Sequence, residues 1–133
     1  MAAATAGISL GGYAVSVGVP LAAGDTAING FRAVLSNLRD AMLANWDGTV
    51  ADIDPEFLHD LRVAVRRTRV VLANARRVLP EDVRERAREH FAWLGGISGA
   101  ARDLDVYQIE WPDYTAALDG TATVALIPLR EHL

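Results

Sequence analysis

The chain has 133 residues, of which 51% are apolar, so it is long enough and apolar enough to bury the core of one domain. It has no run of about eighteen apolar residues, which excludes a membrane-spanning helix, and no cysteine, which excludes disulfides and thiolate metal sites and fits a cytoplasmic location. The net charge of −4 disfavours a globally basic nucleic-acid-binding protein.

Residues 7–20 have the alternating pattern of a short strand. The larger side chains stand at every second position and are followed by Pro20, the alternating residues being Tyr13, Val15, Val17 and Val19. No second strand pattern follows, and a lone strand cannot pair its backbone groups. We therefore expect residues 1–22 to be a leader or the remnant of a preceding domain, and residues 23–133 to form a helical domain.

The first predicted helix begins after Gly24-Asp25-Thr26, which offers side chains suited to an N-cap. Apolar residues then recur at helical spacing, at Ile28, Phe31, Leu35, Leu38, Met42 and Trp46. Gly48 is expected to end this helix at its C-cap. Arg32 and Arg39 share one face of the helix, where they could either extend a cationic surface or form plain solvated surface.

The second predicted helix contains a row of cationic side chains. Asp54-Pro55-Glu56 predicts its start, and residues 59–79 contain neither glycine nor proline before Pro80 ends it. At roughly 100° per residue, one face of this helix collects His59, Arg62, Arg66, Arg69 and Arg76 or Arg77. A separate face is apolar and suited to a core, and it consists of Leu58, Leu61, Val65, Thr68, Leu72, Ala75 and Leu79.

The cationic row requires either an anionic partner or constant solvation. Like charges four residues apart on a helix repel by about 0.2–0.5 kcal/mol per pair. Residues 62–88 hold nine of the thirteen basic residues, and the chain contains no lysine. Arginine suits bidentate binding of phosphate, but a GC-rich genome produces the same bias, and composition does not separate the two explanations.

Pro80-Glu81-Asp82 predicts the start of a third helix that continues to about Leu94. Its arginines alternate with acids, and Asp82 and Arg86 stand at the spacing of a helical ion pair. We therefore interpret this part of the helix as a self-paired solvated face that includes Arg84, Arg86 and Arg88.

The glycines at 95, 96 and 99 are expected to interrupt the helical pattern. After them the sequence predicts a helix over residues 101–111 that Pro112 closes, a short helix over residues 113–118, and the beginning of an amphipathic helix over residues 126–133. Because no stop signal follows that last segment, we expect the domain to be truncated at its C-terminus.

Two segments form a recognisable pair. The first reads Phe57-Leu58-His59-Asp60-Leu61-Arg62-Val63-Ala64-Val65-Arg66-Arg67-Thr68-Arg69. The second reads Trp93-Leu94, followed by glycines and then by Arg102-Asp103-Leu104-Asp105-Val106. In sequence, order and separation these segments resemble the two signatures of the CHAD domain, the conserved-histidine α-helical domain, and the resemblance covers about residues 25–133.

The resemblance implies an all-α fold. It would be an antiparallel helical bundle, the N-terminal part of the domain and first half of a CHAD-type double bundle, preceded by the strand-like segment. CHAD domains bind inorganic polyphosphate in a groove lined by basic residues, localise to polyphosphate granules in bacteria, and often follow a CYTH domain in the same polypeptide. Residues 1–22 stand where such a CYTH domain would end.

The resemblance also gives the cationic row a role. It implies that polyphosphate is bound by His59, Arg62, Arg66, Arg69 and Arg102. Further basic contacts could come from Arg32, Arg39, Arg67, Arg76 and Arg77. The sequence departs from the family pattern at Ala92, where relatives often have a basic residue.

Asp103 and Asp105 are expected to position the arginines. A metal site is the weaker interpretation of these two acids, because side chains two residues apart on a helix point to different faces and no further ligands accompany them.

No catalytic pattern accompanies the row. The sequence has no Ser/His/Asp or Cys/His arrangement, no P-loop with lysine, no HExxH and no ExExK segment. We therefore expect a non-catalytic module without cofactor or metal. Two alternatives stay open: a basic-helix nucleic-acid-binding protein, against which the net acidity and the lack of interleaved aromatic residues count, and a scaffold bundle whose arginines are paired internally.

Overall fold

Helices are the regular elements of the chain in the computed structural model, which describes residues 18–20 and 22–131. They are α1 (Ala27–Val50), α2 (Pro55–Asn74), α3 (Glu81–Ala116), α4 (Gly120–Ala125) and α5 (Ile127–Arg130). No strand occurs among the described residues, so the predicted all-α fold is confirmed. The predicted strand over residues 7–20 lies mostly outside the described residues, and residues 18–20 have no regular secondary structure.

The first two helices begin where the sequence predicts. The side-chain hydroxyl of Thr26, the N-cap of α1, accepts a hydrogen bond from the backbone N–H of Asn29 at 3.4 Å. At the start of α2, the carboxylate of Asp54 accepts from the N–H of Glu56 at 2.9 Å, and Pro55 takes the first helical position. Both caps satisfy backbone donors that have no partner inside the helix.

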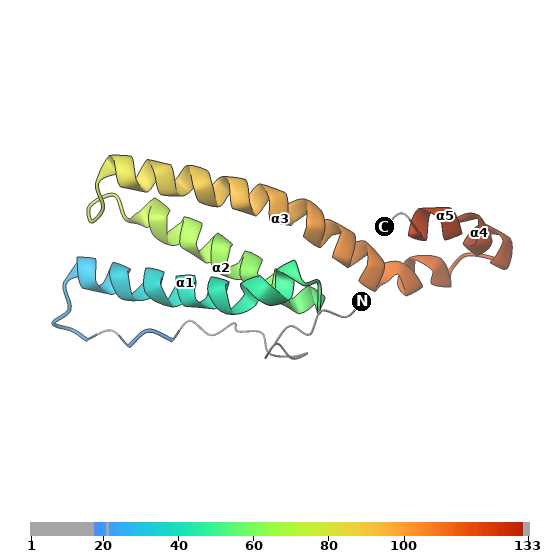
Figure 1. Cartoon of the computed structure of the whole chain (residues 1–133), viewed down its shortest axis with the longest axis horizontal. Helices are drawn as coiled ribbons and strands as arrows, with labels where there is room; N and C mark the ends of the chain where they lie inside the picture. The colour runs from blue at the N-terminus through green and yellow to red at the C-terminus, as the bar shows by residue number, and fades with distance from the viewer. Residues whose placement is uncertain (1–17, 21, 132–133) are drawn as a thin grey trace. The chain divides into compact units, whose positions relative to one another are not determined.

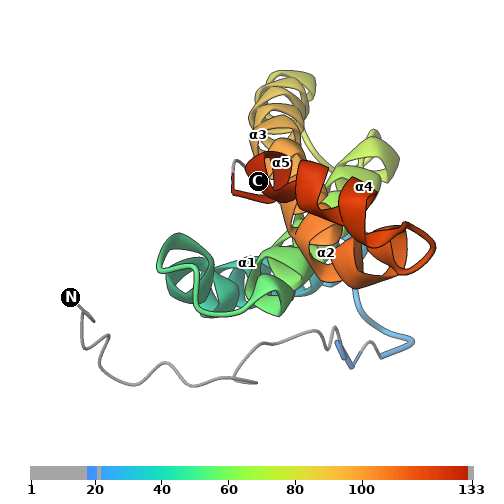
Figure 2. The ribbon, with the colours of Figure 1, turned by 90° about the vertical axis from the view of Figure 1, so that its right-hand side faces the viewer.

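The core of the first compact unit, residues 1–98, lies where α1 and α2 pack against each other. Figures 1 and 2 show α2 flanked by α1 and by the first part of α3, with successive helices running in opposite directions. The predicted apolar face of α2 is buried from Leu58 to Ala75, while Leu79 is half-buried. This apolar face lies on a different side of α2 from the arginines, so the helix can pack into the core while its arginines stay outside it.

Small residues let α2 approach α1 closely. The buried residues of α1 are Leu38, Ala41, Asn45 and Gly48, whereas Ile28 and Trp46 of the predicted stripe are exposed. The side-chain amide of Asn45 donates to the carbonyl of Ala41 at 2.8 Å, which satisfies a polar group inside the core.

The expectation that Gly48 ends α1 is wrong, because this residue lies inside the helix against the ring of Phe57. A β-carbon at Gly48 would stand 2.4 Å from Cγ of Phe57, so the glycine is required by packing rather than by a turn.

Helix α2 ends at Asn74, several residues before Pro80. The Asn74 side chain donates to the carbonyl of Val70 at 2.8 Å, and such local side-chain bonds compete with continuation of the helix. Arg76 and Arg77 therefore lie in the turn that follows α2, and the prediction that one of them extends the helical row is wrong.

Helix α3 continues through the glycines at 95, 96 and 99 and through Pro112, so the predicted break at the glycines and the predicted stop at Pro112 are both wrong. A glycine costs a helix about 1 kcal/mol relative to alanine, which is a penalty and not a stop. A proline removes one backbone hydrogen bond, which a long helix can tolerate with a local bend. Residues 113–116 accordingly belong to α3, and the next helix, α4, begins at Gly120 with Asp119 as its N-cap.

The second unit, residues 99–133, has none of its described residues buried. It contains the end of α3 together with α4 and α5. In the segment predicted to begin an amphipathic helix, α5 covers Ile127–Arg130, while residues 132 and 133 lie outside the described residues. Among the described helices of both units, none combines the length and the apolarity needed to cross a bilayer.

The close contact at Gly48 gives a stability prediction. Gly48→Ala should lower the free energy of unfolding by about 1–3 kcal/mol, because the new methyl group overlaps the Phe57 ring. Gly96→Ala is the matched control, since Gly96 is also inside a helix but has nothing within 4 Å of the added carbon. It should raise stability by up to about 1 kcal/mol. Urea unfolding of both variants tests the pair, and equal effects would contradict the assigned contact.

Candidate functional site

The predicted cationic row lies on α2. His59, Arg62, Arg66 and Arg69 all belong to this helix, and three of them are exposed, whereas Arg62 is half-buried. The structure therefore places all four residues on one helix, but Arg62 differs from the other three because its side chain is partly covered.

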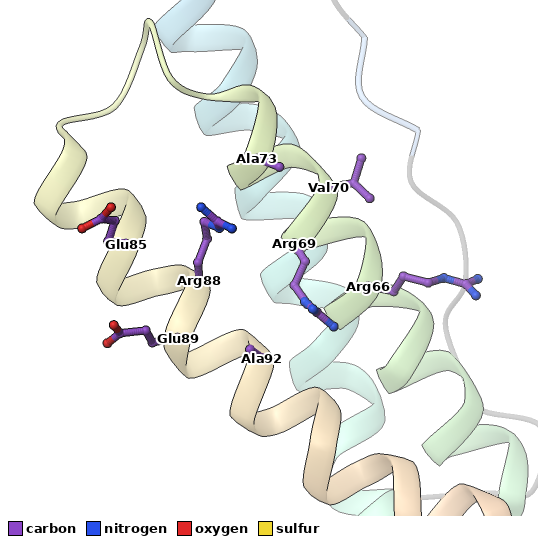
Figure 3. Close-up of a pocket in the computed structure, with 8 residues that line it drawn as sticks. All are labelled: Arg66, Arg69, Val70, Ala73, Glu85, Arg88, Glu89 and Ala92. Atoms are coloured by element: carbon purple, nitrogen blue, oxygen red, sulfur yellow. The ribbon is translucent and has the colours of Figure 1, made fainter.

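A groove of about 680 Å³ runs between α2 and the first part of α3 (Figure 3). Four residues of each helix line it: Arg66, Arg69, Val70 and Ala73 from α2, and Glu85, Arg88, Glu89 and Ala92 from α3. The lining thus combines arginines with small or apolar side chains and two acids. The arginines make this groove suited to an anion, and because no aromatic side chain lines it, the anion that fits it best is one without aromatic groups.

The arginines of the groove point in different directions. Figure 3 shows Arg69 and Arg88 extending into the space between the helices, while the guanidinium group of Arg66 extends away from α3. The carboxylates of Glu85 and Glu89 point away from α2 in the same view. Among the described residues, no ion pair is formed by these three arginines, so their charges are neutralised by solvent or by a bound anion.

Arg62 has a different role, because its guanidinium group is bonded to α3. Its Nη1 donates to the backbone carbonyl of Gly95 at 3.1 Å and to the hydroxyl of Ser98 at 3.2 Å. The Ser98 hydroxyl in turn donates to the carbonyl of Leu94 at 2.7 Å. This side chain therefore ties α2 to α3.

The further contacts predicted from the sequence lie outside the groove. Arg32 and Arg39 of α1 line a separate pocket of about 380 Å³, and Arg39 forms an ion pair with Asp40 at 2.7 Å. Arg67 is exposed on α2 and is absent from the groove lining, as are Arg76 and Arg77 of the following turn.

Arg102, Asp103 and Asp105 belong to the second unit, which is described by itself. Within that unit, Nη1 of Arg102 lies 3.7 Å from Oδ2 of Asp105, and both side chains are largely covered. Asp103 is exposed. Asp105 therefore lies within ion-pair distance of Arg102, and the positioning role expected of Asp103 and Asp105 stays a prediction.

Arg88 is a groove residue that the sequence analysis missed. The prediction of a self-paired solvated face is confirmed for Arg86, which is exposed and pairs with Asp82 at 3.1 Å, but Arg84, which pairs with Glu81 at 3.4 Å, is buried and not solvated. Arg88 forms no such pair among the described residues and faces α2 instead. Its spacing of seven residues from Gly95 is the signal that could have revealed this orientation, because both then lie on the face of α3 that meets α2.

A second cluster of titratable groups lies at the start of α2. Ligand atoms of Glu56, His59 and Asp60 lie within 4.8 Å of one another, so these residues could hold a metal ion. Asp60 is buried, and its Oδ2 has no hydrogen-bond partner. Burial has the largest effect and raises the pKa of this carboxyl above its ordinary value of 3.8; His59 opposes the rise, Glu56 adds to it and Arg67 opposes it.

Comparison with known families identifies the chain. A family model described as the CHAD domain matches residues 33–133, a range that contains α2, α3 and both signature segments. No curated protein and no solved structure matches the chain.

Arg62 and Arg66 should differ in their effect on stability. Arg62→Ala removes charged hydrogen bonds between two helices and should lower the free energy of unfolding by about 1–2 kcal/mol. Arg66→Ala changes an exposed side chain with no ion pair among the described residues, and its effect should stay within about 0.5 kcal/mol. Urea unfolding measures both, and an Arg62 variant as stable as the wild type would show that α3 does not depend on this contact.

Asp60 should make stability depend on pH. Because the folded state holds the Asp60 proton more tightly than the unfolded chain does, the contribution of this group to stability falls as the pH rises from about 4 through the raised pKa. Asp60→Asn does not titrate, so its free energy of unfolding relative to wild type should rise over that interval and then level off. Urea unfolding at a series of pH values gives this difference, and a constant or falling difference would count against the assignment.

Proposed function

This chain belongs to the CHAD domain family, and we propose that it is a non-catalytic helical module that binds inorganic polyphosphate. Membership of the family supports the ligand class, as the resemblance of the two signature segments implies. The groove between α2 and α3 supports the location, because it lies beside the first signature helix and contains arginines with no ion pair among the described residues.

The observation that carries the proposal is the arginine lining of this groove. Arg66 and Arg69 stand one helical turn apart on α2, and a rise of about 1.5 Å per residue places them roughly 4.5 Å apart along the helix axis. Successive units of a polyphosphate chain each carry a negative charge at short intervals. A guanidinium group can bind phosphate oxygens through two parallel hydrogen bonds, and several such contacts in a row add to the affinity without any chemical change in the ligand.

The residues of the row then take different parts. Arg69 would bind phosphate inside the groove, and Arg66, whose guanidinium group extends away from α3, would bind it at the edge of the groove. The exposed His59 would donate to the same chain at the start of α2. Arg62 would act through its contact with α3 rather than through the ligand. Arg102 stays a predicted ligand from the second unit.

The cellular setting follows from the family resemblance and is part of the same proposal. The module would act in a bacterial cytoplasm at polyphosphate granules, and a CYTH domain in the same polypeptide would be its partner. Nucleic acid would be a poor competitor, because the groove lining contains no aromatic side chain on which a base could stack.

Binding measurements on the full chain test the proposal. Long-chain polyphosphate should bind with an affinity that falls as salt is added, and Arg66→Ala combined with Arg69→Ala should weaken binding at least about tenfold. Arg76→Ala combined with Arg77→Ala is the matched control, since it removes the same charge from the turn outside the groove.

Equal losses in the two double variants would show that net charge rather than the groove governs binding. Displacement of bound polyphosphate by a moderate excess of RNA would favour the nucleic-acid alternative. Wild-type affinity in the Arg66/Arg69 variant would remove the groove from consideration.

A further inference from the structure

We infer that Arg88 of α3 is a polyphosphate-binding residue, so that the groove holds the phosphate chain from α3 as well as from Arg69 of α2. The inference rests on the proposed function and adds a second wall to its site, the walls being the groove-lining faces of α2 and α3. In this arrangement Arg69 and Arg88 bind the ligand, whereas Arg62 holds the two walls at a fixed distance through its bonds to α3.

The two side chains approach the same space from different helices. Arg69 extends from α2 toward α3, and a β-carbon at Gly95 of α3 would stand 3.5 Å from its Nη1. Arg88 extends from α3 into the same groove, and in Figure 3 its guanidinium group lies toward Ala73 while that of Arg69 points the other way along the groove. The residues beside them in the lining are Ala73 and Ala92, whose small side chains leave this space open.

The charges of the groove also favour an anion at this position. Glu85 and Glu89 flank Arg88 in sequence, yet neither forms an ion pair with it among the described residues, and both carboxylates point away from α2. The neighbouring Arg84 and Arg86 do pair with acids of the same helix. Arginines that line one groove without acidic partners repel each other, and a bound anion offsets this repulsion.

The arrangement selects a thin, highly charged ligand. Different units of one phosphate chain can accept hydrogen bonds from the two arginines, because both arginines line the groove. The groove of about 680 Å³ supplies small and apolar side chains between its charged groups, and it offers no aromatic surface to a base. A linear phosphate chain that runs between α2 and α3 meets these conditions.

Arg62 keeps the two walls together. Its bonds to Gly95 and Ser98 join α2 to the same stretch of α3 that follows Ala92. Loss of these bonds would move the Arg88 wall relative to the Arg69 wall without removing any cation that touches the ligand.

The test compares Arg88→Ala with Arg86→Ala in the full chain, with long-chain polyphosphate as the probe. Both variants remove one exposed arginine from the same helix, but Arg86 is paired with Asp82 and is absent from the groove lining. Arg88→Ala should weaken binding about tenfold, and Arg86→Ala should change it less than about twofold. Circular dichroism and thermal unfolding check that both variants fold, and Arg88→Gln replaces Arg88→Ala if the alanine variant does not.

A double-variant cycle tests whether one phosphate chain contacts both residues. If Arg69 and Arg88 hold the same phosphate chain, then removing both should weaken binding by less than the product of the two separate losses, because loss of either contact already loosens the chain in the groove. The inference is overturned if the Arg88 variant binds as tightly as the Arg86 variant while the Arg66/Arg69 variant loses binding, and the proposed function then still stands. Failure of the wild-type chain to bind polyphosphate would overturn both.

Discussion

The contact between the Arg62 guanidinium group and α3 organises the site. Its bonds to the Gly95 carbonyl and the Ser98 hydroxyl cross between two helices, whereas the tight apolar packing of the first unit lies between α1 and α2. Between α2 and α3, hydrogen bonds from a long polar side chain therefore hold the helices together, whereas between α1 and α2 buried apolar residues do so. The groove beside it exists because α2 and α3 are held near each other without being packed together.

The arginines of α2 share one chemistry but differ in their surroundings. The guanidinium group of Arg62 donates its hydrogen bonds to acceptors on α3. Arg66 and Arg69 line a groove, and neither forms an ion pair with an acid among the described residues. On α3 the same division appears, because Arg84 and Arg86 pair with acids of their own helix and Arg88 does not. The position of an arginine on its helix, rather than its residue type, therefore decides whether its guanidinium group can bind a ligand.

The sequence alone was enough for the local features of the fold. The caps at Thr26 and Asp54 and the apolar face of α2 depend on nearby residues, and the structure has them as predicted. The packing of Gly48 against Phe57, the bond from Arg62 to Gly95 and the orientation of Arg88 depend on partners in another helix, which helical spacing cannot supply. Helix α3 has none of the breaks that the sequence predicts, because glycine and proline lower the stability of a helix without ending it.

The central claim is that a phosphate chain lies between α2 and α3 while Arg62 stays bound to α3. A crystal structure of the full chain with polyphosphate tests it most directly. The account predicts phosphate units within hydrogen-bonding distance of Arg69 and Arg88, with the bonds from Arg62 to Gly95 and Ser98 intact. Phosphate bound by Arg62 in place of those bonds, or bound only outside this groove, would contradict it.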